Sequence, residues 1–381
     1  MEHLRKIDIN TGAAVSGKDF FNREKEFESF KRRLNSTKHI VISQIRRTGK
    51  TSFMKEFIKR NQGSPILYLA VQGCQTEENF YKRIYAQTIE YCKNEKALDF
   101  MKNKWNKITE IIPEIKGVKL GQIKETNDQI VDKLIKIFKK EQFILFIDEF
   151  PDFIINLKKN GTVESFLGRF RDFRNECDKL KTVLTGSINL IRTVSKLGLS
   201  DKLNEYKTFK FSLFSKSSSL LLFRCLLFSI DYELNKKEQN YILPYIEDGM
   251  PYFIQLLADN IMDISPENKV ITINNLKVAI KRFRQLDEFG LEQFHDRLNK
   301  YLKEEKLEKP AKIILSHLSH DKLDFDDLYS FVDNEINREQ LDELLNRLEE
   351  EAYIKKEGED YAFLSKLMAG WWREKKHFER R

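Results

Sequence analysis

The most informative segment of this chain is His39-Ile-Val-Ile-Ser-Gln-Ile-Arg-Arg-Thr-Gly-Lys-Thr-Ser52. It begins with an apolar run typical of a buried strand, and the residues from Ser52 to Asn61 follow the helical period. A strand that enters a helix through a Gly-containing loop directs backbone N–H groups and the positive helix end at one point. We therefore expect this loop to bind an anion such as phosphate.

The loop also fits a known phosphate-binding pattern. Gln44 to Thr51 match G-x-x-x-x-G-K-[ST], except that Gln44 stands where the first Gly belongs. In this pattern Lys50 reaches the β- and γ-phosphates of a nucleotide, and the Thr51 hydroxyl is a ligand of Mg²⁺. The residues predicted to contact the nucleotide are Gln44, Ile45, Arg46, Arg47, Thr48, Gly49, Lys50, Thr51 and Ser52. A side chain at position 44 restricts the turn, so we expect a reshaped loop. A chance helix N-terminus is the alternative.

A second motif lies about a hundred residues further on. The apolar strand Phe143-Ile-Leu-Phe-Ile147 is followed by Asp148 and Glu149. Ligands bind beyond the carboxyl ends of strands in open parallel sheets, so these two acids are predicted to lie beside the phosphate loop. Asp148 would hold Mg²⁺ through water, and Glu149 would orient and deprotonate the attacking water. Two acids after a strand also occur as a solvated turn, but both motifs together argue against chance.

Around these motifs, predicted strands and helices alternate, which indicates an α/β fold with a parallel sheet. The helical pattern covers 20–34, 77–93, 128–140 and 163–177, and further strands are predicted over 65–71 and 182–185. Residues 115–123 resemble a small hairpin insertion. We expect an α/β core over 1–215, a helical lid over 216–300 and a third domain over 301–381, which begins after a charged linker.

Three weaker features accompany the motifs. Ser187 follows the strand over 182–185, where its hydroxyl would sense the γ-phosphate, although a plain turn fits equally well. Arg169, Arg171 and Arg174 share one helix and are candidates for an arginine finger in a neighbouring subunit, but a solvated basic face is favoured. Pro251 follows Gly249 and Met250 at a position that suits a helix start.

Composition narrows the class of protein. The chain has 381 residues, 41% of them hydrophobic, and a formal net charge of +8. No apolar stretch reaches the roughly 18–20 residues of a membrane span, and the N-terminus carries charges of both signs without an apolar core, so we expect a cytoplasmic protein. The four cysteines are far apart and include no C-x-x-C pair. They are predicted to be reduced and mostly buried.

The motifs together resemble the archaeal-type ATPases of the STAND branch of AAA-related P-loop proteins. Phe21-Asn-Arg-Glu24 is similar to the F-x-G-R-E box of that family, Arg46-Arg-Thr-Gly-Lys-Thr51 to its R-R-x-G-K-T loop (Walker A), and Asp148-Glu-Phe150 to its D-E-[FL] box (Walker B). The resemblance covers nearly the whole chain. It implies an AAA-like P-loop NTPase core, a helical lid whose Pro251 turn approaches ATP, and a C-terminal winged helix. It also implies that Arg23 lies near the base and ribose.

The resemblance implies an ATP hydrolase that uses Mg²⁺, with Lys50, Glu149 and Ser187 in catalytic roles and Thr51 and Asp148 at the metal. Binding and hydrolysis of ATP would drive motion between the domains. The alternative is a nucleotide-gated signalling or defence scaffold with little turnover. Glu149 favours the hydrolase, whereas Gln44 leaves room for the scaffold. Phosphate release with and without DNA or cell extract would separate the two.

The C-terminal region fits the implied winged helix in its order of elements. The pattern from residue 312 to residue 364 indicates three helices and two strands, and Trp371 and Trp372 follow. From 301 to 381 the chain has 15 Lys and Arg against 20 Asp and Glu, which repels phosphates. We therefore predict that the isolated domain does not bind duplex DNA and contacts the ATPase core, another copy or a protein partner. DNA binding would fall to the basic segments 102–124 and 375–381.

Overall fold

The computed structural model describes most of the chain and divides it into two compact units. It describes residues 4–43, 47–61, 64–93, 125–186, 190–264, 269–285, 289–303 and 305–379. Unit 1 comprises Met1–Asn22, Ile45–Gly49 and Ser212–Arg381, and unit 2 comprises Arg23–Gln44 and Lys50–Phe211. The hairpin predicted over 115–123 and the basic segment 102–124 lie outside the described residues.

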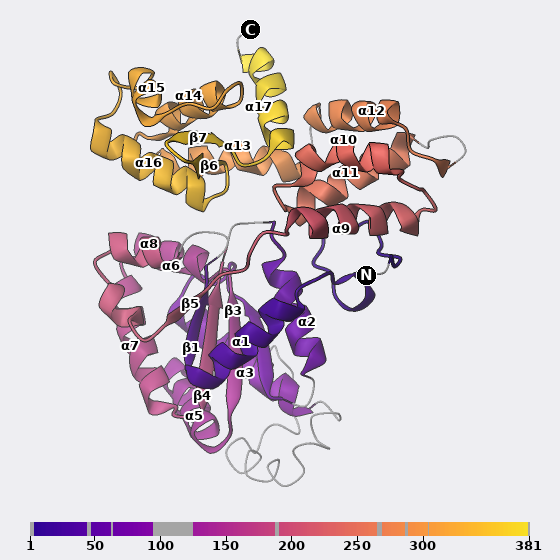
Figure 1. Cartoon of the computed structure of the whole chain (residues 1–381). Helices are drawn as coiled ribbons and strands as arrows, with labels where there is room; N and C mark the ends of the chain where they lie inside the picture. Colours follow the sequence, from indigo (N-terminus) through magenta and orange to yellow (C-terminus); the bar gives the residue numbers. More distant parts are fainter. Residues whose placement is uncertain are drawn as a thin grey trace. The chain divides into compact units, whose positions relative to one another are not determined.

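Unit 2 contains the predicted parallel sheet. Its strands are β1 (His39–Ile42), β2 (Ile66–Ala70), β3 (Phe143–Asp148), β4 (Leu180–Thr185) and β5 (Lys207–Phe209). Their spatial order is β2-β3-β4-β1-β5, and every neighbouring pair is parallel (Figure 1). The edge strand β5 was not predicted, because three residues with one apolar side chain have no strand-like pattern of their own.

Side chains of the sheet alternate between two apolar layers. Phe143, Leu145 and Ile147 of β3 belong to one buried cluster with the helices on that face. These helices are α3 (Glu77–Lys93), α5 (Asn127–Lys140), α6 (Phe150–Lys159), α7 (Val163–Glu176) and α8 (Leu190–Lys196). Phe146 points to the other face, where its ring centroid lies 6.0 Å from that of Phe30 and 5.7 Å from that of Phe57. The sheet is therefore covered on both sides, as parallel sheets require.

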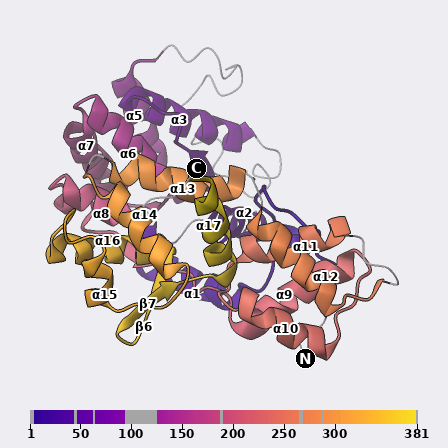
Figure 2. The same cartoon turned by 90° about the horizontal axis from the view of Figure 1, so that it is seen from above.

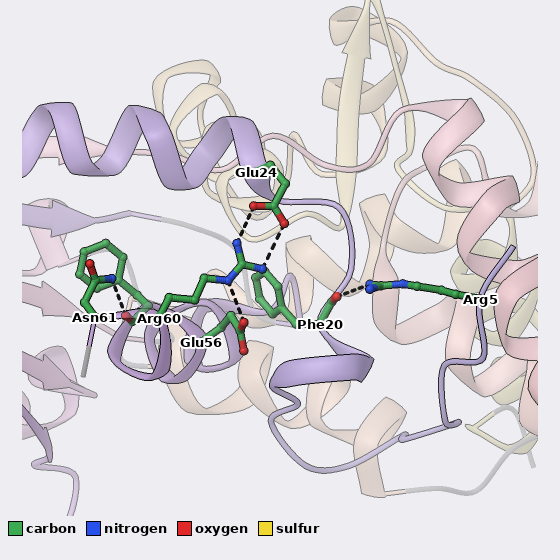
Figure 3. Close-up of polar contacts among 7 residues, drawn as sticks. Arg5, Phe20, Glu24, Glu56, Arg60 and Asn61 are labelled. Carbon is green, nitrogen blue, oxygen red and sulfur yellow. Dashed lines mark hydrogen bonds and ion pairs between the residues drawn. The ribbon is translucent and has the colours of Figure 1, made fainter. Parts of the chain in front are cut away.

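Helices α1 (Glu24–Ser36) and α2 (Lys50–Arg60) cover the second face. Arg60 of α2 forms an ion pair with Glu24 of α1. The Arg60 guanidinium donates from Nε to Glu56 Oε1 at 2.8 Å and from Nη2 to Glu24 Oε1 at 3.1 Å (Figure 3). We expected a helix from residue 20, but α1 begins at Glu24 because Asn22 adopts a left-handed φ of 45° that interrupts the helix.

Unit 1 contains helices and, next to them, the N-terminal segment. The helices that follow the sheet are α9 (Lys216–Ser229), α10 (Lys236–Ile246), α11 (Pro251–Ile264), α12 (Ile273–Arg284) and α13 (Phe289–Leu302). Ile7 is fully buried in their core, and Arg5 donates a hydrogen bond to the Phe20 carbonyl (Figure 3). In the described part of this region the predicted lack of strands is confirmed, apart from one bridge between Glu233 and Val270.

The end of unit 1 has the predicted order of three helices and two strands. These elements are α14 (Glu308–Leu318), α15 (Phe325–Ser330), α16 (Arg338–Glu350), β6 (Ile354–Glu357), β7 (Asp360–Phe363) and the closing α17 (Lys366–Glu379). β6 and β7 are antiparallel, and Leu323 adds a bridge to Tyr361. Helix α17 contacts α10, α12 and α14. Figure 2 shows it beside α14. Its residues Trp371 and Trp372 are buried in the apolar core that also contains side chains of α9 to α13.

The described residues also include two short 3₁₀ helices and the four cysteines. The 3₁₀ helices, Gly17–Asp19 and Ser200–Leu203, lie in unit 1 and unit 2. All four cysteines are buried and free, as predicted. Among the described helices, none combines the length and the apolar character that crossing a membrane would need.

Candidate active site

The phosphate loop predicted from the sequence connects β1 to α2. Helix α2 begins at Lys50, and Thr51 and Ser52 follow in its first turn, where backbone N–H groups lack helical partners. Lys50 and Thr48 are buried, and Gly49 has a φ of 91°, which a residue with a Cβ adopts only with strain. Gln44, Ile45 and Arg46 lie outside the described residues. The described half of the loop thus presents a helix N-terminus with a lysine beside it.

The two predicted metal-binding side chains lie next to each other. Thr51 donates from Oγ1 to Asp148 Oδ2 at 3.2 Å, which joins the start of α2 to the carboxyl end of β3. Asp148 is 5% exposed, and its Oδ1 accepts a hydrogen bond from the backbone N of Glu149 at 3.0 Å. Burial raises the pKa of the Asp148 carboxyl above its ordinary value, against the hydrogen bonds that it accepts.

Sequence reasoning missed a third donor to this carboxylate. Tyr68 of β2 donates from its hydroxyl to Asp148 Oδ2 at 2.8 Å. Burial and the neighbouring Asp148 charge raise the pKa of Tyr68, so the hydroxyl stays a donor. The only signal in the sequence was a tyrosine within the apolar run Ile66-Leu-Tyr-Leu-Ala70, and a half-buried tyrosine in a strand is common without any function.

Glu149 lies at the turn between β3 and α6. It is the N-cap residue of α6 and has a left-handed φ of 59°, an uncommon conformation for a residue other than Gly. Such strained residues concentrate at functional sites, where the surrounding structure maintains them. The backbone therefore turns sharply at Glu149 directly after Asp148 places its carboxylate against α2.

The end of β4 was predicted to supply a hydroxyl that senses phosphate. Ser187 lies outside the described residues. Thr185, two residues earlier, is 1% exposed, and its Oγ1 has no hydrogen-bond partner in the described structure. Thr185 pairs with Ile42, the last residue of β1 before the loop.

Arg23 was expected near the base and ribose of the nucleotide. It is 4% exposed and forms an ion pair with Glu26, with 2.8 Å between Nη1 and Oε1. Its guanidinium lies 5.7 Å from the centroid of the Phe211 ring. Burial lowers the pKa of Arg23 from its ordinary value, against the effect of Glu26. Arg23 is thus held within unit 2 by local contacts.

Pro251 begins α11 in unit 1, directly after a tight turn. Gly249 has a φ of 74°, and a Cβ there would lie 2.2 Å from the Phe214 carbonyl oxygen, so only glycine fits. Within the same unit, the Arg47 guanidinium lies 4.2 Å from the ring centroid of Tyr252, the residue after Pro251. Its Nη2 also donates to Gln293 Oε1 at 3.4 Å.

Of the three arginines of α7, Arg169 is exposed, whereas Arg174 is fully buried. Arg174 donates from Nε to Glu205 Oε1 at 3.1 Å and from Nη2 to the Lys202 carbonyl at 3.0 Å. Arg169 forms an ion pair with Glu77. The favoured surface reading was therefore wrong for Arg174. Its guanidinium cannot serve as an arginine finger either, because it lies inside its own unit and stabilises it.

The donors present suit Mg²⁺. No group of three or more His, Cys, Asp or Glu side chains that could hold a metal occurs among the residues that the structure describes. Magnesium at nucleotide sites requires only one or two carboxylates together with phosphate oxygens and water. Asp148 and Thr51 supply a carboxylate and a hydroxyl oxygen within 3.2 Å of each other, and both are hard ligands of the required kind.

The parallel sheet, the helix that begins at Lys50 directly after Gly49 and the acidic end of β3 define a P-loop ATPase. A family model described as an ATPase domain predominantly from Archaea matches residues 20–257. This match covers more than half of the chain, so the chain belongs to that family of ATPases. The predicted class of protein is thereby confirmed.

Solved structures show the same fold. The Walker-type ATPase PABY2304 of Pyrococcus abyssi superposes with a TM-score of 0.65 at 16% identity, over 96% of this chain and 99% of that chain. The ORC2 protein of Aeropyrum pernix, solved as ADPNP and ADP complexes, superposes with a TM-score of 0.51 at 10% identity, over 95% and 98%. A search of the curated proteins found no match.

Proposed function

We propose that this ATPase binds ATP together with Mg²⁺ at the start of α2 and hydrolyses it with Glu149 as the base. One observation carries the proposal: the hydrogen bond of 3.2 Å between Thr51 and Asp148 joins the phosphate loop to the acidic end of β3. The two motifs were recognised separately in the sequence, and a chance helix start would have no reason to meet a buried carboxylate. Family membership supports the same reading.

In this proposal each side chain has a distinct role. The N–H groups of the first turn of α2 and the Lys50 ammonium bind the β- and γ-phosphates, and Thr51 and Asp148 hold the metal. Bound Mg²⁺ neutralises charge on the phosphate oxygens. Glu149 is the nearest carboxylate in sequence to that pair, and it orients the attacking water and accepts its proton.

The remaining sequence predictions extend this proposal. We infer that 216–300 act as the lid that carries Pro251 toward the nucleotide, and that 301–381 form a winged helix, since Leu323, β6 and β7 supply its small sheet. Ser187, Arg23 and the loop residues from Gln44 to Thr48 complete the nucleotide site in this proposal. From the same resemblance we propose that the chain belongs to the STAND branch and that ATP hydrolysis drives motion between its domains.

A nucleotide-gated scaffold is the second candidate function. Gln44 replaces a loop glycine, and in the described structure Arg169 and Arg174 are engaged in ion pairs within unit 2. Both features favour slow turnover, because a side chain at position 44 restricts the phosphate loop and because the loss of an arginine finger slows hydrolysis by a factor of roughly 10³–10⁵. Rapid steady-state phosphate release by the purified chain would exclude this scaffold.

The decisive experiment compares three substitutions. Lys50→Ala should abolish ATP binding measured by calorimetry, because the phosphates lose the buried Lys50 ammonium. Glu149→Gln should keep binding and lower hydrolysis by roughly 10²-fold or more, the usual scale for a positioned base. Asp148→Ala should lose the dependence of hydrolysis on Mg²⁺ together with activity.

Equal ATP affinity of the wild type and Lys50→Ala would refute the assignment of the loop. Lys59→Ala is the matched control, since this lysine lies in the last turn of the same helix, away from its N-terminus. It should leave ATP affinity unchanged.

A further inference from the structure

We propose that Tyr68 is a positioning residue for magnesium: its hydroxyl fixes the Asp148 carboxylate in the orientation that the metal requires. The inference rests on the proposed function, because it assigns a role at the same site. It concerns a side chain that neither motif contains and that comes from a different strand, β2.

The register of the sheet explains why Tyr68 reaches Asp148. Tyr68 is paired with Phe146 of β3, and Asp148 follows two residues later on the same face. Leu67 and Leu69, the neighbours of Tyr68, belong to the apolar cluster on the opposite face. A diagonal neighbour across two strands is within reach of an aromatic side chain, so the pairing directs the Tyr68 hydroxyl to the carboxylate.

The hydrogen bonds around Asp148 restrain both of its oxygens. Oδ2 accepts from Tyr68 at 2.8 Å and from Thr51 at 3.2 Å, and Oδ1 accepts from the Glu149 backbone at 3.0 Å. Of the two donors to Oδ2, the Thr51 hydroxyl is itself a proposed metal ligand and must adjust when the metal binds. Tyr68 has no such second task and holds Oδ2 in both states.

A carboxylate that is 5% exposed has little access to water that could replace a lost donor. Without the Tyr68 hydroxyl, Asp148 would keep its charge buried with fewer hydrogen bonds and would rotate more freely about its side-chain bonds. Partners of this kind, outside the metal's own ligands, typically change metal affinity by 10–100-fold when they are removed.

The test uses the full chain and the substitution Tyr68→Phe, which removes the hydroxyl and keeps the ring. ADP affinity is measured by calorimetry with excess Mg²⁺ and with EDTA, and hydrolysis is measured as a function of Mg²⁺ concentration. We expect unchanged ADP affinity in EDTA and a rise of roughly ten-fold in the Mg²⁺ concentration for half-maximal activity. The gain in ADP affinity on adding Mg²⁺ should shrink by a similar factor.

Tyr206→Phe is the matched control. The Tyr206 hydroxyl lies 2.6 Å from Thr182 Oγ1 in the same unit. Thr182 pairs with His39, the first residue of β1, whereas the phosphate loop follows the last residue of that strand. Removal of the Tyr206 hydroxyl also deletes one partly buried hydrogen bond, and it should leave the Mg²⁺ dependence unchanged. On an Asp148→Asn background, Tyr68→Phe should cause no further change in the dependence of ADP affinity on Mg²⁺.

Identical Mg²⁺ titrations for Tyr68→Phe and the wild type would overturn the proposal. So would an equal loss of ADP affinity with Mg²⁺ and with EDTA, because that result indicates general damage to the site. Failure of the wild type to bind nucleotide at all would instead contradict the proposed function, so the two failures are distinguishable.

Discussion

At the scale of single residues, His39 shows how burial controls the charge of a side chain in unit 2. It is 5% exposed at the start of β1, and its Nδ1 lies 2.8 Å from Thr182 Oγ1, which in turn lies 2.6 Å from the Tyr206 hydroxyl. Burial, and next the Arg174 charge, lower the pKa of His39 to about 4. The imidazole is therefore neutral in the folded protein at neutral pH.

This pKa predicts how stability depends on pH. The unfolded chain has an ordinary histidine pKa of roughly 6.5, so the folded value is depressed. The contribution of His39 to the free energy of unfolding is complete above about pH 6.5 and is lost as the pH falls toward 4, by at most about 3 kcal/mol. His39→Gln should flatten this part of the stability curve, measured by urea unfolding at a series of pH values.

His320→Gln serves as the control, because His320 is exposed and its replacement should leave the pH profile unchanged. The His39→Gln profile gives the contribution of the carboxylates to the free energy of unfolding. If the wild type shows no change between pH 6.5 and 4.5 after that profile is subtracted, the prediction is contradicted.

At the scale of elements, the end of β4 packs unusually close to the start of α6. A Cβ at Gly186 would lie 2.3 Å from Cδ and 2.8 Å from Cγ of Pro151, which occupies the first turn of α6. Pro151 is a rigid ring fixed by the helix, so neither side can yield easily. Gly186 thereby holds the turn that carries Asp148 and Glu149 against the neighbouring strand.

Gly186→Ala should therefore displace this turn. We expect a loss of about 1–3 kcal/mol in the free energy of unfolding, the usual cost of overpacking, and a fall in hydrolysis because Glu149 moves with the turn. Chemical denaturation and phosphate release would measure the two effects.

The matched control is Gly168→Ala in α7, where an added Cβ meets nothing within 4 Å. It should be neutral or stabilise the protein by up to about 1 kcal/mol, because Ala favours the helix. Equal effects of the two substitutions would show that the close contact at Pro151 is unimportant.

At the scale of the whole molecule, the distribution of charge matters more than its sum. Residues 301–381 carry a net charge of −5 within a chain of +8. On α16, Arg338 lies 2.5 Å from Asp326 and Arg347 lies 2.7 Å from Glu305, so both arginines already have acidic partners. The helix that would enter a DNA groove in a winged helix offers little uncompensated positive charge to phosphates.

We therefore predict that the double substitution Arg338→Ala and Arg347→Ala leaves the affinity of the full chain for duplex DNA unchanged. Fluorescence anisotropy at two salt concentrations would measure that affinity. Neutralising the lysines and arginines of 375–381 is the comparison, since any electrostatic binding through that tail should weaken. A loss of affinity in the double variant alone would overturn the prediction.

Local patterns in the sequence are sufficient to predict the class of protein and most of its elements. The apolar runs of β1 and β3, the loop before Lys50 and the acids Asp148 and Glu149 are local patterns, because strand burial, helix starts and phosphate binding depend on neighbouring residues. The three helices and two strands between residues 308 and 363 were predictable for the same reason. The same patterns predict Thr51 and Asp148 as a pair at the proposed metal site.

The remaining features arise only from contacts in the folded protein. Strand β5 has too few residues to show a pattern, and the burial of Arg174 depends on Glu205 and Lys202, which lie about 30 residues away. Tyr68 meets Asp148 only because β2 pairs with β3 in a register that brings position 68 opposite 146. Contacts of this kind arise between distant segments, and their free energy is gained only when the sheet assembles, so no local pattern records them.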